Sequence, residues 1–233
     1  MKNYLSALKY CYENGDLVKS RAGNVKKAFG YQMRFDLEKG FPAITTKKLA
    51  WKAVVSELLW FLEGSNDERR LAEILYEDDR ENLEDKKTIW TQNAKADYWK
   101  NKSNFDGDVG KIYGVQWRDF NGVDQIKNLI KGLKESPHSR RHILTAWNPA
   151  ELDEMSLPPC HAFSQFYVSN NKLSCQLYQR SCDMFLGVPF NIASYSILIH
   201  IIARECGYEV GEFVHSLGDF HIYEEHFEQV KIQ

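Results

Sequence analysis

The residue best suited to covalent chemistry is Cys160, which lies in the Leu157–His161 segment (LPPCH), where two prolines precede it. Prolines restrict the backbone, so they can hold a thiol in a fixed pose. A cysteine attacks as its thiolate, and that form needs cationic or hydrogen-bond-donating neighbours. The segment is also compatible with a buried structural cysteine beside a turn. No zinc-type ligand spacing surrounds it, so we expect no metal.

Arginines could supply the positive charge that a thiolate needs. Arg140 and Arg141 precede an expected strand, Arg180 and Ser181 end another, and Arg21 lies in an Arg-Ala-Gly-Asn segment that we expect to be flexible. Forked guanidinium donors and a serine hydroxyl match the oxygens of a phosphate dianion. The ordinary alternative for any single arginine is a surface salt bridge.

Two polar residues adjoin or interrupt apolar runs, Asn191 after Leu186–Phe190 and Glu57 within Val54–Trp60. An amide offers one donor group and one acceptor, which suits the imide edge of uracil, although a flipped amide would suit cytosine. Asn191 could instead cap the following helix.

Glu57 is a carboxylate inside an apolar helix, so it must be paired or functional. Burial would raise its pKa and suit it to proton transfer. A structural ion pair is the alternative for Glu57.

The Gly218–Tyr223 segment places His221 and Tyr223 at an expected junction of a strand and a helix. Both side chains can donate a hydrogen bond to a sugar hydroxyl.

The helices and strands that would position these residues do not alternate as in repeated βαβ units. The sequence therefore predicts an α+β fold and one domain over residues 1–233. Residues 65–108 are the most polar stretch and predict short helices and long loops. The expected helices are 2–14, 49–62, 122–132, 190–205 and 221–230, and the expected strands are 28–37, 142–147, 162–168, 172–179 and 211–217.

Composition limits the function classes. The net charge of −2 argues against broad electrostatic binding to DNA, RNA or an anionic membrane. Five cysteines without a C-x-x-C pair argue against a disulfide framework, and the N-terminus lacks the apolar core of a signal peptide. We therefore expect a cytoplasmic protein with no DNA and no membrane partner.

Seven segments, in this order, together resemble the thymidylate synthase family across essentially the whole chain. They are Gly40–Lys47, Glu57–Leu62, Ile112–Trp117, Leu157–His161, Leu177–Ser181, Leu186–Tyr195 and Gly218–Tyr223. The resemblance implies a large twisted mixed β-sheet backed by helices. It also implies a homodimer whose sheets pack face to face.

The resemblance implies a methyltransferase that converts dUMP to dTMP, with 5,10-methylenetetrahydrofolate as one-carbon and hydride donor and no metal. Cys160 would be the nucleophile that adds to the pyrimidine ring. Asn191 would read the uracil edge; in the related dCMP hydroxymethylases an aspartate takes this place. Glu57 would shuttle protons through ordered water, supported by Tyr113 and His161.

The remaining implied roles concern binding. The phosphate would be held by Arg21, Arg180 and Ser181, joined by Arg140 and Arg141 from the second subunit. The ribose would be held by His221 and Tyr223. The folate side would be formed by Asp183, Trp90, Lys47, Leu186, Gly187 and Phe190.

Two departures from the family pattern bear on these expectations. The first phosphate loop reads Arg21-Ala22-Gly23 where the family commonly has Arg-Thr-Gly. The sequence ends at Gln233, whereas typical synthases continue into a tail that folds over the folate. Without such a lid, water could quench the methylene intermediate. A dUMP hydroxymethylase and a truncated, dUMP-binding form with impaired turnover are therefore the alternatives, besides an inactive nucleotide- or RNA-binding scaffold.

Overall fold

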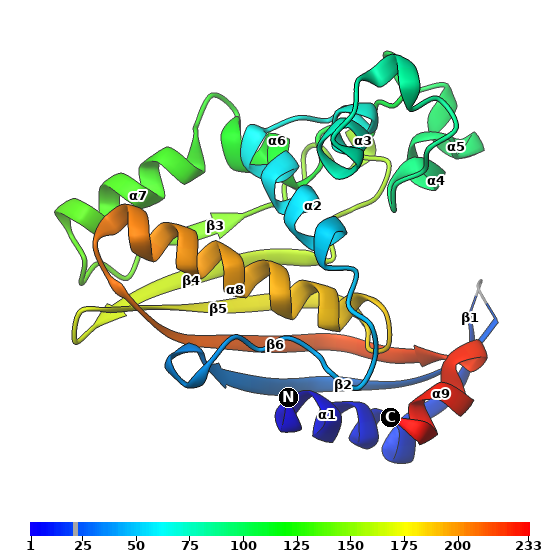
Figure 1. Cartoon of the computed structure of the whole chain (residues 1–233), viewed down its shortest axis with the longest axis horizontal. Coiled ribbons are helices and arrows are strands. Elements are labelled where there is room, and N and C mark those ends of the chain that lie inside the picture. Colours follow the sequence, from blue (N-terminus) through cyan, green and yellow to red (C-terminus); the bar gives the residue numbers. More distant parts are fainter. Residues whose placement is uncertain (21–22) are drawn as a thin grey trace. The chain divides into compact units, whose positions relative to one another are not determined.

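A mixed β-sheet organises the part of the chain that the computed structural model describes, residues 1–20 and 23–233. Its strand order is β1-β2-β6-β5-β4-β3 (Figure 1). The parallel pair is β5 with β6; β1 with β2, β2 with β6, and β4 with β5 are antiparallel. The strands are β1 (Asp16–Ser20), β2 (Gly23–Asp36), β3 (Ile143–Thr145), β4 (His161–Ser169), β5 (Lys172–Asp183) and β6 (Glu209–Tyr223). The expected mixed sheet backed by helices is confirmed.

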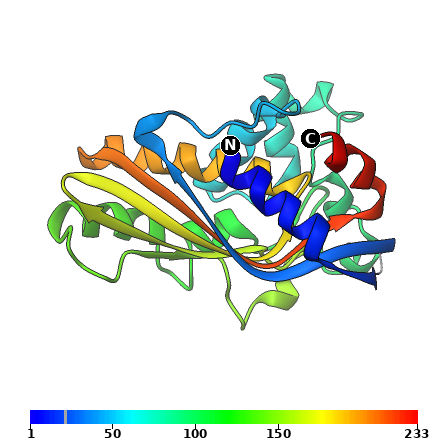
Figure 2. The ribbon, with the colours of Figure 1, turned by 90° about the horizontal axis from the view of Figure 1, so that it is seen from below.

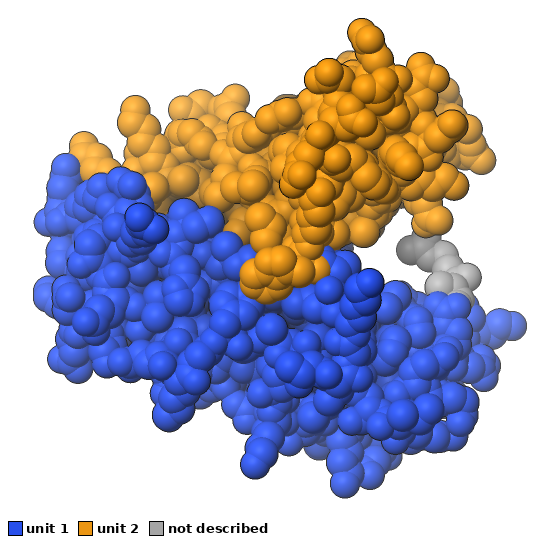
Figure 3. Space-filling view, viewed as in Figure 1, with its two compact units in different colours: residues 1–50, 133–143, 160–233 blue, residues 51–132, 144–159 orange. Residues whose placement is uncertain are grey.

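The chain divides into two compact units, coloured separately in Figure 3. Unit 1 comprises residues 1–50, 133–143 and 160–233, and unit 2 comprises residues 51–132 and 144–159. The expectation of one catalytic domain over 1–233 stays a prediction.

In unit 1, α1 (Lys2–Asn14) lies against β2, and α8 (Gly187–Cys206) lies against β5 and β6 (Figure 2). The α8 sequence is apolar on most faces, which is typical of a helix buried in a core. It ends at Gly207, whose φ of 78° closes the helix in the left-handed region. Short helical segments complete the unit: Leu37–Lys39, Glu224–His226 and α9 (Phe227–Ile232).

The strands of unit 1 bury one face. In β4, Phe166 and Val168 are buried, whereas Phe163 and Tyr167 are 43% and 62% exposed. This alternation follows from the two-residue period of a strand. The exposed face therefore carries aromatic side chains that this chain does not cover.

Unit 2 is mainly helical. Its helix α2 packs against both α3 and α6. Gly114 in α6 permits the close approach, because a Cβ there would lie 2.7 Å from the Phe61 carbonyl oxygen. The helices of this unit are α2 (Trp51–Glu63), α3 (Glu68–Tyr76), α4 (Thr91–Ala94), α5 (Asp97–Lys100), α6 (Tyr113–Arg118) and most of α7 (Gln125–Glu135), with helical turns at Arg80–Asn82 and Leu152–Glu154.

The predicted elements are present, but several of their bounds differ from the prediction and one strand was not predicted. Residues 221–223 were expected to open the final helix, but they continue β6, and helical structure begins only at Glu224. The reason is long-range pairing, since Val25 to Lys27 of β2 pair with Tyr223 to His221. The strand β1 was not predicted, and β2 begins at Gly23, earlier than the expected residue 28.

Among the described residues, no helix combines the length and apolar character needed to cross a membrane. Within the same residues, no group of three His, Cys, Asp or Glu side chains is arranged to hold a metal ion.

Candidate active site

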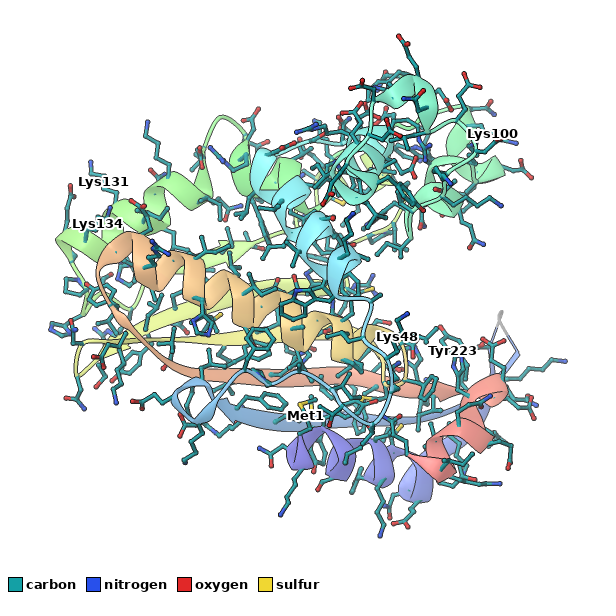
Figure 4. The ribbon with its side chains drawn as sticks, in the orientation of Figure 1. Met1, Lys48, Lys100, Lys131, Lys134 and Tyr223 are labelled. Carbon is teal, nitrogen blue, oxygen red and sulfur yellow. The ribbon has the colours of Figure 1, made fainter. Side chains whose placement is uncertain are left out.

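A pocket of about 480 Å³ lies in unit 1 where β1, β2, β5 and β6 meet. It is lined by four residues predicted to bind phosphate or ribose, namely Arg180, Ser181, His221 and Tyr223. Figure 4 labels Tyr223 at the end of β6. The parallel register, which pairs Ser181 with Asp219 and Asp183 with His221, brings these strand ends to one edge. The pocket therefore unites residues that are far apart in the sequence.

Sequence reasoning missed three charged residues of this pocket, Lys19, Lys27 and Asp219. The Asp219 carboxylate lies 3.0 Å from His221 Nδ1 and 3.2 Å from Lys27 Nζ. A carboxylate only accepts hydrogen bonds, so it keeps the proton of His221 on Nδ1. The signal in the sequence is the Asp-x-His spacing, because residues i and i+2 share one face of a strand.

Cys160 is half-buried and immediately precedes β4. Its backbone carbonyl accepts a hydrogen bond from the Arg180 amide at 2.8 Å, so strand pairing places the thiol-bearing residue beside a pocket arginine. The buried structural role fits other cysteines better: Cys11, Cys175 and Cys182 are fully buried, and burial raises the pKa of each thiol, that of Cys11 to about 12.

Asn191 lies at the end of a partly buried chain of hydrogen bonds. Its Oδ1 accepts from Gln179 Nε2 at 3.1 Å, and the same Nε2 group donates to the Ser181 carbonyl at 3.0 Å. The Gln179 Oε1 atom lies 2.8 Å from His215 Nε2. Because α8 begins at Gly187, Asn191 is inside the helix, and the alternative role as its N-cap is wrong.

This chain of hydrogen bonds, which we call the amide relay, has a fixed direction. A backbone carbonyl can only accept, so Ser181 requires the nitrogen of Gln179, and that nitrogen in turn requires the oxygen of Asn191. Burial lowers the pKa of His215 to about 3, so the ring is neutral and donates through Nε2. The relay therefore holds the Asn191 amide in one of its two orientations.

His161 begins β4 and is buried, with Nδ1 at 3.0 Å from the Tyr195 hydroxyl. Burial, with a smaller contribution from His215, lowers the pKa of His161 to about 3. The imidazole is therefore neutral at physiological pH and can relay a proton only through its hydrogen bonds.

The residues predicted for the folate side that belong to unit 1 gather around one turn. Asp183 Oδ1 accepts from the backbone amides of Phe185 and Leu186 at 3.0 and 3.1 Å. A Cβ on Gly187 would lie 3.5 Å from Asp183 Cβ and 3.8 Å from Asn191 Oδ1. This turn therefore sits directly beside the amide relay.

Two further folate-side candidates flank this turn. Lys47 donates to the Phe185 carbonyl, and its ammonium lies 4.2 Å from the centre of the Phe185 ring. Burial lowers the pKa of Lys47, opposed by the charge of Asp183. Phe190, in the first turn of α8, is half-buried.

Unit 2 brings together Glu57, Trp90 and Tyr113. Glu57 is 5% exposed, and its Oε1 accepts from the Trp90 indole nitrogen at 2.7 Å. The Tyr113 and Trp90 rings are 6.0 Å apart, centre to centre. Burial raises the pKa of Glu57 to about 7, and the Trp90 hydrogen bond opposes that rise. Among the described residues no cation pairs with Glu57, which argues against the structural ion pair.

Arg140 and Arg141 are not among the described residues that line the pocket. Arg140 and Arg141 are exposed, in the segment before β3. The Arg140 carbonyl accepts from Gln165 Nε2 at 3.1 Å, which ties this segment to β4. Arg21 lies outside the described residues.

Comparison with known proteins decides the family. The family model described as thymidylate synthase matches residues 2–233. The chain is also 47% identical, over 243 aligned residues, to a thymidylate synthase of Mycoplasma genitalium; the match covers all of this chain and 85% of that protein. The chain belongs to the thymidylate synthase family.

In this thymidylate synthase family member, the motif-bearing residues were identifiable from the sequence. The residues that orient them, Asp219, Gln179 and His215, were not assigned. Gln179 lies inside a motif-bearing segment, between Tyr178 and Arg180. This position was the sequence signal that could have identified it as a site residue.

Proposed function

We propose that this protein is a methyltransferase that converts dUMP to dTMP through a covalent adduct on Cys160. In this reaction 5,10-methylenetetrahydrofolate is both the one-carbon donor and the hydride donor. The amide relay carries the proposal, because it gives Asn191 the hydrogen-bonding pattern of a uracil reader. Family membership supports the same reaction.

Recognition of the base follows from the relay. Because Asn191 Oδ1 accepts from Gln179, the two N–H donors of the Asn191 amide point away from Gln179 and are available to a ligand. The second lone pair of Oδ1 is also available to accept a hydrogen bond. Uracil offers an acceptor at O4 beside a donor at N3, which complements that arrangement. Cytosine offers the reverse, so it would require a flipped amide that places two donors against each other at Gln179.

Recognition of the sugar phosphate uses the pocket. Arg180 and Ser181 supply a fork of N–H donors and a hydroxyl for the phosphate. His221, oriented by Asp219, and Tyr223 supply donors for the ribose hydroxyl. Arg21 is a further phosphate ligand in this proposal.

The chemistry begins at the Cys160 sulfur. The thiolate adds to C6 of the pyrimidine, and the electron pair moves to C5, so the ring becomes an enolate whose O4 accepts from Asn191. C5 attacks the folate methylene, the C5 proton leaves, and elimination of the folate amine gives an exocyclic methylene. Hydride from the reduced folate adds to that methylene, sulfur leaves C6, and dTMP and dihydrofolate result.

Glu57 handles protons in this scheme. A pKa of about 7 lies near physiological pH, where a group can both take up and release a proton. Tyr113, and the neutral His161 with its Tyr195 partner, support ordered water on the path.

Binding of the folate uses Asp183 for the pterin, with Leu186, Gly187, Phe190 and Trp90 beside the ring system. Lys47, beside Phe185, would meet the folate tail. The support for this assignment in unit 1 is the turn at Asp183, which places the carboxylate next to the base-reading Asn191.

A homodimer completes the proposal. The sheet face opposite α1 and α8 is uncovered in this chain, and its aromatic side chains, including Tyr167 at 62% exposure, suit burial against a second copy. Arg140 is tied to Gln165 on β4, so it lies at the edge of that face. We propose that Arg140 and Arg141 enter the partner's phosphate site. The cysteine pattern supports a cytoplasmic location, and the net charge of −2 supports a function without a DNA or membrane partner.

The test is to incubate the protein with dUMP and methylenetetrahydrofolate, and to determine the product mass and the rise in dihydrofolate absorbance. We expect dTMP together with an equal amount of dihydrofolate, and no turnover by Cys160→Ala. A hydroxymethyl product without folate oxidation would mark the hydroxymethylase instead. An unchanged nucleotide under all conditions would overturn the proposed reaction.

A further inference from the structure

A buried charge pair lies at the start of α3 in unit 2. Glu68 and Arg69 are 1% and 8% exposed. The Arg69 guanidinium donates to both Glu68 oxygens, from Nε at 2.7 Å and from Nη2 at 2.6 Å. Its Nη1 donates to the carbonyls of Leu83 and Lys86. Such a pair is costly to bury, and its retention needs a reason beyond the ion pair itself.

The Glu68 carboxylate also binds two threonines. Its Oε1 accepts from Thr88 Oγ1 at 2.6 Å and from Thr91 Oγ1 at 2.5 Å. A carboxylate paired with an arginine only accepts, so both hydroxyl protons must point toward Glu68. The hydroxyl oxygens are then acceptors for other groups.

Those oxygens hold the backbone that carries Trp90. Thr88 Oγ1 accepts from the Trp90 amide at 3.1 Å, and Thr91 Oγ1 accepts from the Thr88 amide at 2.8 Å. The indole nitrogen of Trp90 donates to Glu57 at 2.7 Å. Hydrogen bonds thus run from Glu68 through the Thr88–Thr91 turn to the main chain of Trp90, and the side chain of Trp90 carries the indole that donates to Glu57.

We propose that Glu68 is a positioning residue for the Trp90–Glu57 hydrogen bond, acting through the hydroxyls of Thr88 and Thr91. The relevance of this to turnover rests on the proposed function, in which Glu57 moves protons. The charge of Glu68 fixes the direction of both threonine hydroxyls, and these fix the main chain from which the indole reaches Glu57.

Within unit 2, the groups around Glu57 leave its pKa dependent on the hydrogen bond from Trp90. The helix α2 packs against α3 and α6. The charged side chains of α3 are engaged away from Glu57: Arg69 with Glu68, and Arg70 with Glu63 and Glu73. From α6, the Tyr113 ring packs beside Trp90. Arg118 of α6 pairs with Asp124. Among the described residues, the indole is therefore the side chain that donates to ionised Glu57, and loosening this bond raises the pKa of Glu57.

The test measures ionisation of Glu57 directly, without turnover. An infrared pH titration follows the protonated carboxyl band, which is assigned to Glu57 by its loss in Glu57→Gln. We compare Thr91→Val, which removes the hydroxyl, with Thr91→Ser, which retains it. We expect the midpoint to rise by about one pH unit in Thr91→Val, since a hydrogen bond to a charged group is worth roughly one to two units. Thr91→Ser should stay within about 0.3 units of the wild type.

A second pair of variants tests the charge of Glu68. Glu68→Gln should raise the midpoint as Thr91→Val does. The matched control is Asp108→Asn, because Asp108 is another fully buried carboxylate of unit 2, bonded to Asn66, Asn104 and Gly110. The control should leave the midpoint unchanged. If Glu68→Gln fails to fold, because Arg69 is left without its counter-charge, the Thr91 pair still decides.

An unchanged midpoint in folded Thr91→Val overturns the inference, as does an equal rise in Asp108→Asn. Because the readout is ionisation, these outcomes are separate from failure of the proposed reaction, which the wild-type product assay reports. In Thr91→Val, the pH dependence of kcat should shift in the same direction and by the same amount as the infrared midpoint.

Discussion

Replacement of Gln179 by leucine tests whether the amide relay sets the choice of base. Gln179→Leu replaces the amide by an apolar side chain of similar size at a site that is 2% exposed, and removes both N–H donors of the amide nitrogen. Asn191 then loses the group that holds its oxygen, and its amide can adopt either orientation. We expect discrimination between dUMP and dCMP to fall.

The magnitude follows from the hydrogen bond between Gln179 and Asn191. In the wild type, a flipped Asn191 forfeits this bond and leaves a buried donor without an acceptor, which costs about 1–3 kcal/mol. This corresponds to a change of about 5- to 150-fold in the ratio of the two dissociation constants. Isothermal titration calorimetry with dUMP and dCMP, in one buffer, measures that ratio without requiring turnover.

His215→Phe is the matched control. It removes the His215 hydrogen bond to the Gln179 oxygen but leaves the Ser181 carbonyl, which alone dictates the direction of the relay. The ratio should change less than in Gln179→Leu. An unaltered ratio in folded Gln179→Leu, or an equal loss in His215→Phe, would refute the argument that the backbone carbonyl sets the orientation.

Three further outcomes are expected. Cys160→Ser should lose measurable product formation while calorimetry shows dUMP affinity within about 3-fold of the wild type, because sulfur supplies the nucleophile and not the binding energy. Asp219→Asn should weaken dUMP by about 5-fold, from loss of the charge-assisted bond that orients His221, yet leave an analogue without the ribose hydroxyl unaffected in the same assay. Burial raises the pKa of Glu57 from 4.5 to about 7, so the stabilising effect of its proton is present below pH 4.5 and lost as the pH rises to about 7. Glu57→Gln should therefore be more stable than the wild type at pH 8, by about 3 kcal/mol, and equal to it at pH 4, as measured by urea denaturation.

The fold was accessible from the sequence where local pattern and tertiary structure agree. The helix over 190–205 was predicted from its apolar run, and α8 occupies Gly187–Cys206. The end of β6 could not be predicted from the sequence. Residues 221–223 favour either state locally, and their strand conformation comes from pairing with β2, almost two hundred residues away.

The candidate site divides in the same way. Most of the residues proposed to meet the ligand lie in motif segments, so their types and order were sufficient to predict them. The orienting residues act across strands: His215 reaches Gln179 only because β6 lies beside β5 in parallel. Glu68 lay in a stretch interpreted as short helices and long loops, and no role was predicted for it. Its burial depends on Arg69 and on two threonines twenty or more residues ahead.

The two orienting devices share one physical principle. Amide and hydroxyl groups can present either hydrogen-bonding polarity, so they carry no fixed direction by themselves. In unit 1 the direction comes from the Ser181 carbonyl, and in unit 2 it comes from the Glu68 carboxylate; both anchors can only accept. Each anchor acts through at least one intermediate residue on a residue proposed to meet the reacting groups: Ser181 through Gln179, and Glu68 through the threonines and Trp90. Substitution of an intermediate group weakens such a chain. A donor in place of the Glu68 side chain would reverse the direction in unit 2, whereas the Ser181 carbonyl belongs to the backbone and persists with any side chain at that position. A change of base specificity is therefore to be sought at Gln179 and Asn191.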